Sequence, residues 1–155
     1  MASRTHRSLI AVALLLGAFC AYSMPASDCF DDENLKKTQL EKPQGTLIYV
    51  WSPRMVYSAQ QITVAERAAQ SLGLNFTAVH DARVSPEDIS AAIHTVNHAA
   101  GSLPLCAQKL LGNEALRHFP TAFVVTAQGV HRHPIVGAMP ASAWHSSITE
   151  RLQQP

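Results

Sequence analysis

The sequence has little net charge and no cluster of charges of one sign. Its 155 residues include 12 Lys and Arg against 11 Asp and Glu, a formal charge of +1. Proteins that bind nucleic acid electrostatically usually carry a basic patch or stripe. This balance excludes such a footprint, and it favours no other class of partner.

Long apolar runs are also absent, except near the beginning of the chain. No stretch after residue 23 is apolar for the roughly 20 residues that a helix needs to cross a bilayer. We therefore expect no membrane insertion once the first segment has been removed.

That first segment, MASRTHRSLIAVALLLGAFCAYS, has the pattern of a secretory signal peptide. Arg4 and Arg7 precede an apolar run over residues 9–19, and small residues follow. We predict a signal peptide over residues 1–23, with cleavage after Ser23 and a weaker alternative after Ala26. The mature protein is then exported.

Cysteine is scarce, and its positions are informative. Of three cysteines, Cys20 leaves with the signal peptide, and bulky Phe19 before it disfavours a lipid-modified Cys20. Cys29 and Cys106 remain, an even pair in an oxidising compartment. We predict a structural disulfide between them, which stabilises by about 3 to 4.5 kcal/mol in the chain-entropy model. A redox-active pair is the weaker alternative, because the spacing is long.

About 130 mature residues suffice for one domain. Residues 24–45 are polar and charged, and they predict an N-terminal arm with a short helix that ends before Pro43 and Gly45. From Thr46 the composition becomes apolar. The domain is predicted over residues 46–155.

The run TLIYVW, residues 46–51, predicts a strand buried on both faces. Ser52 follows at the position of a helix N-cap and Pro53 at the first helical position, where both residues are preferred. Apolar residues then recur at helical spacing from Met55 to Leu72. These features predict a strand, a cap and one helix.

The rest of the chain alternates in the same way. A strand is predicted over 75–82, followed by a helix that is capped by Ser85 and extends to residue 101. Two shorter helical pieces are predicted between 105 and 119, and a hairpin of strands 121–126 and 130–136 follows them. The chain ends with a predicted helix that carries Trp144, Ile148 and Leu152. This order predicts an α/β sandwich with a mixed sheet.

Three motifs make residues 46–152 resemble the thioredoxin-like superfamily. In YVWSPRM, Trp51 and a four-residue turn are similar to the family's W-C-x-x-C; in FPTAFVV, Pro120 and Thr121 match its cis-proline; and Gly137 precedes the last helix in the family's order. The resemblance implies a three-layer α/β sandwich with a mixed four-stranded sheet. The stretch 85–119 is longer than in a minimal thioredoxin, which predicts a helical insertion before the cis-proline strand.

The family's two catalytic cysteines are missing, because Ser52 and Met55 occupy their positions. Disulfide exchange needs an attacking thiolate and a second sulfur. A helix N-terminus cannot bring a hydroxyl pKa near neutrality, and a thioether forms no disulfide. The thioredoxin reaction is therefore not expected at this turn.

Two other chemistries are disfavoured. Ser52 as a nucleophile would need a base, which nothing in the sequence nominates. His94 with His98, and His131 with His133, have spacings compatible with metal ligation, and Met55 could add a soft ligand. Paired histidines on solvated faces are common, however, so we predict no metal and no cofactor.

The resemblance implies instead a surface that holds an extended polypeptide by adding a strand. The predicted binding residues are Trp51, Ser52, Pro53, Arg54, Met55, Pro120 and Thr121. We expect a periplasmic binding or assembly module for an envelope protein or extended peptide, with a faint similarity to thioredoxin-like components of bacterial conjugative transfer systems. The alternative is a thiol-disulfide oxidoreductase that uses Cys106 with Cys29.

Overall fold

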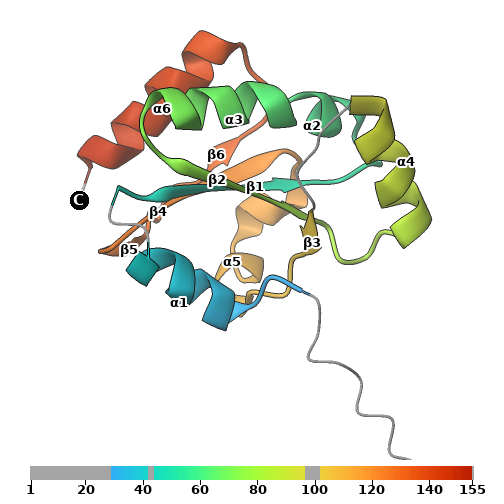
Figure 1. Cartoon of the computed structure of the whole chain (residues 1–155), viewed down its shortest axis with the longest axis horizontal. Coiled ribbons are helices and arrows are strands. Elements are labelled where there is room, and N and C mark those ends of the chain that lie inside the picture. Colours follow the sequence, from blue (N-terminus) through green and yellow to red (C-terminus); the bar gives the residue numbers. More distant parts are fainter. Residues whose placement is uncertain (1–28, 42–43, 97–101, 155) are drawn as a thin grey trace, which may run out of the picture.

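The computed structural model describes residues 29–41, 44–96 and 102–154. The predicted signal peptide and His98 lie outside these residues. A mixed sheet forms the centre, with strand order β3-β2-β1-β4-β5, and β6 pairs with β4 (Figure 1). The central strands are β1 (Thr46–Trp51), β2 (Asn75–His80) and β4 (Thr121–Thr126).

Strand β1 lies in the middle of the sheet, between β2 and β4. It runs parallel to β2 and antiparallel to β4, and all six of its residues are buried. The continuous apolar run that predicted a doubly covered strand is thereby confirmed.

The sheet has more strands than the four predicted. A short parallel strand, β3 (Leu103–Pro104), lies beside β2, in a segment expected only to lead into a helical piece. The predicted strand 130–136 is divided into β5 (Gly129–Val130) and β6 (Ile135–Val136), and both pair with β4. Strands of two residues are too short for a periodic pattern to show in the sequence.

Helices cover both faces of the sheet. Figure 1 shows α3 (Ile62–Ser71) and α6 (Ala141–Gln153) on one face, α1 (Asp32–Glu41) and α5 (Gln108–Leu111) on the other, and α4 (Pro86–Val96) at one end. A 3₁₀ turn, η1 (Glu114–Arg117), follows α5. The cap predicted for α4 is confirmed, since the Ser85 hydroxyl accepts the N–H of Asp88 at 3.2 Å.

The helix expected after β1 is divided into α2 (Val56–Gln60) and α3, with Gln61 between them. The Gln61 side-chain oxygen accepts the Trp144 indole N–H at 2.8 Å and the Met139 backbone N–H at 3.3 Å. This contact ties the bend to the start of α6.

The predicted polar arm contributes to the core. Leu35 on α1 is 1% exposed and packs beneath the sheet with Phe30 and Leu105. The Phe30 N–H donates to the Pro104 carbonyl, and the Phe30 carbonyl accepts from Cys106 N–H, both at 2.8 Å. The short helix expected here is confirmed, and it closes one face of the sheet. Within the described ranges, no helix is long and apolar enough to span a bilayer.

Candidate functional site

The turn after β1 does not form the helix cap that the sequence predicted. Helix α2 begins at Val56, its N-cap is Met55, and no side chain caps it. The Ser52 carbonyl closes a turn by accepting the Met55 N–H at 3.0 Å, and Ser52 itself is 2% exposed. The assignments of Ser52 as N-cap and Pro53 as first helical residue are therefore wrong.

Buried polar contacts hold this turn instead. The Ser52 backbone N–H donates to the Ser58 hydroxyl oxygen at 3.1 Å, and the Tyr49 hydroxyl donates to the Ser58 carbonyl at 2.7 Å. Ser58 is fully buried, and burial raises the pKa of Tyr49 well above its usual value. Tyr49 therefore stays a neutral donor at any physiological pH.

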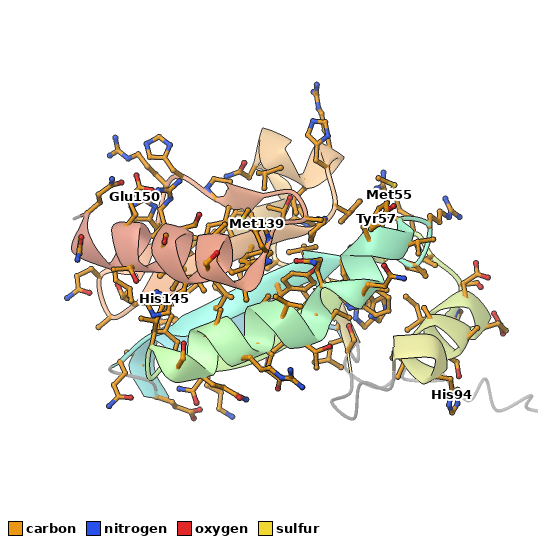
Figure 2. All side chains as sticks on the ribbon, turned by 90° about the horizontal axis from the view of Figure 1, so that it is seen from above. Met55, Tyr57, His94, Met139, His145 and Glu150 are labelled. Carbon is orange, nitrogen blue, oxygen red and sulfur yellow. The ribbon has the colours of Figure 1, made fainter. Side chains whose placement is uncertain are left out.

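The first residues after the turn expose apolar side chains. Met55 is 50% exposed, Val56 64% and Tyr57 74%. Figure 2 shows Met55 and Tyr57 together at the beginning of α2, on the side away from the His94 end of α4. The expectation that Met55 belongs to the buried stripe is wrong, because the late start of α2 rotates that residue out of the core.

The peptide bond between Phe119 and Pro120 is cis, as the resemblance implied. The Thr121 hydroxyl donates to the His118 carbonyl at 2.6 Å, and the Gly137 N–H donates to the Pro120 carbonyl at 2.9 Å. Thr121 also lies opposite Val50 in the β1–β4 pairing. The predicted turn and the predicted cis-proline are thus brought together at one end of the sheet.

Burial divides the seven predicted binding residues into two groups. Pro53 is partly exposed, and Arg54 and Met55 are exposed, so they can contact a partner. The side chains of Trp51, Ser52, Pro120 and Thr121 are buried. Contact between these four residues and a partner would therefore be made through their backbone, and their part in binding stays a prediction. The low exposure of Ser52 also removes it as an accessible nucleophile.

A second polar cluster lies beneath the turn and was not predicted. The Ser102 hydroxyl oxygen accepts the Trp51 indole N–H at 2.9 Å and lies 3.0 Å from Nδ1 of His80. His80 is 7% exposed, and burial lowers its pKa, against smaller raising effects of Asp81 and Ser102. The Ser102 hydroxyl thus joins the side chains of Trp51 and His80. Only the position of His80 at the end of an apolar strand could have signalled this cluster.

Asp81 follows His80 and faces two arginines. Its carboxylate accepts Nε and Nη2 of Arg83, each at 2.8 Å, and these hydrogen bonds are the main cause of its lowered pKa. The charge of Arg54 adds a smaller lowering effect. Arg54 therefore lies within electrostatic reach of the end of β2.

The fold brings Cys29 and Cys106 together. Both are thiols in this structure, and their side chains are hydrogen-bonded to each other. That hydrogen bond, followed by burial, raises the pKa of Cys106 to about 11. The two residues flank the Phe30–Leu105 bridge, so residues 77 apart in sequence are neighbours, as the predicted disulfide requires.

The histidine pairs do not assemble a metal centre in the described part of the chain. The rings of His131 and His133 lie 5.9 Å apart, while His94 is exposed on α4. No group of three or more His, Cys, Asp or Glu side chains in residues 29–41, 44–96 and 102–154 converges as metal ligands would.

Solved structures similar to this chain are thioredoxin-like proteins. The pneumococcal exposed lipoprotein thioredoxin Etrx1 of Streptococcus pneumoniae superposes with a TM-score of 0.57 at 15% identity, over 75% of this chain and 89% of that one. A putative thiol:disulfide interchange protein DsbE from Chlorobium tepidum gives 0.55 at 16%, over 76% and 82%.

A secreted Mycobacterium tuberculosis disulfide oxidoreductase homologous to DsbE of E. coli gives a TM-score of 0.53 at 12% identity, over 74% of this chain and 85% of that one. No protein-family model matches the chain, and no curated protein does. The thioredoxin-like fold predicted from the sequence is confirmed, and identities this low carry the fold alone.

Proposed function

We propose that this chain is a non-catalytic binding module that holds an extended polypeptide at the turn after β1. The surface consists of Arg54, Met55, Val56 and Tyr57, with the cis-Pro120 loop beside it. We place it in the bacterial envelope, after export, and in a conjugative transfer apparatus by resemblance.

The observation that carries this proposal is the exposed apolar run Met55–Tyr57 on a rigid support. Three consecutive apolar side chains at the start of α2 are each at least half exposed. The turn before them is held by the hydrogen bond from the Ser52 N–H to the Ser58 hydroxyl. Clustered apolar side chains on a soluble surface commonly mark interaction sites. Arg54 beside them can pair with a carboxylate on the same partner.

Strand β6 extends the proposed binding surface. Val136 on β6 is 42% exposed and lies opposite Thr121, which in turn lies opposite Val50 on β1. An extended peptide beside the cis-proline loop would therefore meet apolar side chains on both sides. Backbone hydrogen bonds would supply affinity, and these side chains would supply selectivity.

The thiol-oxidoreductase alternative rests on the contact between Cys29 and Cys106. Against it, Cys29 is 8% exposed, and a Cys106 pKa of about 11 leaves only about one thiolate in ten thousand at neutral pH. Fast exchange usually requires an accessible thiol with a pKa near ambient pH. We therefore assign this pair a structural role.

Site-specific photo-crosslinking in cells tests the binding surface. A photoreactive amino acid replaces Tyr57, and in a matched control it replaces Leu40, which is 76% exposed on α1 at the other face of the sheet. We expect a discrete covalent adduct at position 57, reduced by Arg54→Ala, and none at position 40. Equal adducts at both positions, or none at 57, would contradict the proposal.

A reductase assay separates the two functions. The purified protein should not accelerate insulin reduction by dithiothreitol, and Cys106→Ser should leave the position-57 adduct unchanged. Reductase activity that disappears in Cys106→Ser would instead support the oxidoreductase alternative.

A further inference from the structure

The sheet has an open edge at β5. This strand is the last one on its side of the sheet, and Figure 1 shows it at the end of the molecule where α6 also ends. The His131 N–H donates to the Val124 carbonyl at 2.8 Å, so these two residues form a hydrogen-bonded pair beside β5. In an antiparallel ladder such pairs alternate with pairs that exchange no hydrogen bonds. The next register pair, Val125 with Val130, is therefore of the second kind, and the Val130 N–H and C=O point away from β4.

The outward-pointing groups of Val130 are left unpaired by the part of the chain that the structure describes. No described residue forms a hydrogen bond with the Val130 N–H or C=O. Unpaired groups at a strand edge are a template for pairing with another extended chain. An extended segment can therefore join the sheet at Val130 as an added strand.

A groove lies beside this edge, between the β4–β5 hairpin and the end of α6. Its volume is about 490 Å³, and Gly129 and Val130 line it. Val124, which is 2% exposed and belongs to the core beneath α6, forms the floor, and Leu152 adds an apolar wall. The groove gives room for side chains that an added strand would direct toward α6.

The charge of the groove favours an acidic occupant. Arg132, Arg151 and His131 line it, and no described Asp or Glu does. Arg151 is engaged within the chain, because its Nε donates to the His133 carbonyl at 2.9 Å and its Nη1 lies 3.0 Å from the Glu150 carboxylate. Arg132 is exposed, and its side chain has no ion pair or hydrogen bond with any described residue. Its guanidinium can therefore pair with a carboxylate of a bound segment.

We propose that the β5 edge binds an extended acidic segment of another protein. The segment pairs with the N–H and C=O of Val130, and a carboxylate on its α6 side faces Arg132. Side chains of a strand alternate between the two faces, so acidic residues at every second position can all lie on the groove side. The β5 edge is at the opposite end of β4 from Pro120, so the inference does not rest on the proposed function.

Amide NMR titration of the purified protein tests this surface with three acetylated peptides of equal length, in which Thr alternates with Glu, Gln or Lys. We expect the Thr-Glu peptide to bind about two- to fivefold more tightly than the Thr-Gln peptide, and the Thr-Lys peptide not to bind. The largest shift changes should be at the amides of Val130 and Arg132. Added salt should weaken the Thr-Glu peptide and leave the Thr-Gln peptide unchanged, because salt screens an exposed ion pair.

Two variants separate the charge from the strand edge. Arg132→Gln should weaken the Thr-Glu peptide about two- to fivefold and leave the Thr-Gln peptide unchanged. Val130→Pro removes an N–H that takes no part in the pairing with β4, and it should weaken both peptides. Arg67→Gln, at an exposed position on α3, is the matched control and should change neither.

An unchanged His131 amide signal in Val130→Pro would show that the hairpin is intact. If that signal moves, the shift map of the wild type and the Arg132→Gln titration decide the question. The proposal is overturned if the amides of β5 do not shift, if the Thr-Lys peptide binds as tightly as the Thr-Glu peptide, or if Arg132→Gln binds the Thr-Glu peptide as the wild type does.

Discussion

The rings of Trp51 and His80 meet edge to face with their centroids 6.2 Å apart, and both side chains bond to the hydroxyl of Ser102. Trp51 ends β1 and His80 ends β2, and the two are register partners. Ser102 thus links the last residue of β1 to the last residue of β2. We therefore expect the stability of this end of the sheet to depend on the charge of the His80 imidazole.

Acidification should destabilise the protein through His80. Its pKa is lowered from the ordinary value of 6.5 by burial, so the folded state binds this proton less readily than the unfolded state. The contribution is fully present above pH 6.5 and is lost as the pH falls from there through the lowered value. The free energy of unfolding, measured in urea from pH 8 to pH 4, should decline in this way. His80→Gln should make the decline smaller, whereas His145→Gln, an exposed control, should leave it unchanged. An identical pH dependence in both variants would count against it.

Loss of the Ser58 hydroxyl should loosen the turn. In Ser58→Ala the buried Ser52 N–H loses its acceptor, an expected cost of about 1 to 3 kcal/mol in the free energy of unfolding. Ser142→Ala on the exposed side of α6 is the control and should stay within about 0.5 kcal/mol of wild type. The Ser58→Ala variant should also give less crosslinking at position 57. Full stability in Ser58→Ala would show that water or another group replaces the hydroxyl.

Truncation of Leu35 should reveal that α1 belongs to the folded unit. Leu35 is 1% exposed and Leu40, five residues later on the same helix, is 76% exposed. Leu35→Ala should lower the free energy of unfolding by about 2 to 5 kcal/mol, whereas Leu40→Ala should change it by less than about 0.5 kcal/mol. Similar small changes in both would mean that α1 contributes little to stability.

The cysteine pair should be oxidised when the protein is isolated from an oxidising compartment. Its two thiols would lose two electrons and two protons to a small-molecule or protein disulfide, and thiol titration should then detect neither cysteine until a reductant is added. The measured loss of stability on reduction should be about 3 to 4.5 kcal/mol or less. Titratable thiols in the untreated exported protein would contradict this disulfide.

In the reduced protein, Cys106 should react slowly with iodoacetamide at neutral pH. Its pKa of about 11, against an ordinary 9.0, is raised first by the hydrogen bond with Cys29. The rate in Cys29→Ala should therefore reach half its maximum at a lower pH than in wild type. A wild-type rate that is already maximal near pH 8 would refute the assignment of a shielded thiol.

The strands and helices were predictable where the sequence carries a local pattern. The apolar run 46–51 and the Ser85 cap are as the local pattern predicted, and the cis bond at Pro120 is as the family resemblance implied. The boundaries of α2 were not, because Ser52 and Pro53 satisfy the local preferences of a helix start. The contact of Ser52 with Ser58, which the local pattern does not encode, places that start at Val56 instead.

The sequence alone determined that no sulfur nucleophile stands at positions 52 and 55, and that a single pair of cysteines remains after the predicted export. Only the tertiary structure decided which side chains this leaves exposed at the turn, that Ser102 joins Trp51 to His80, and that Cys29 touches Cys106. The physical reason is the separation along the sequence of the residues that interact. Caps, turns and periodicity arise between residues only a few positions apart. Contacts across 51 residues, as between Trp51 and Ser102, exist only once the sheet has brought its strand ends together.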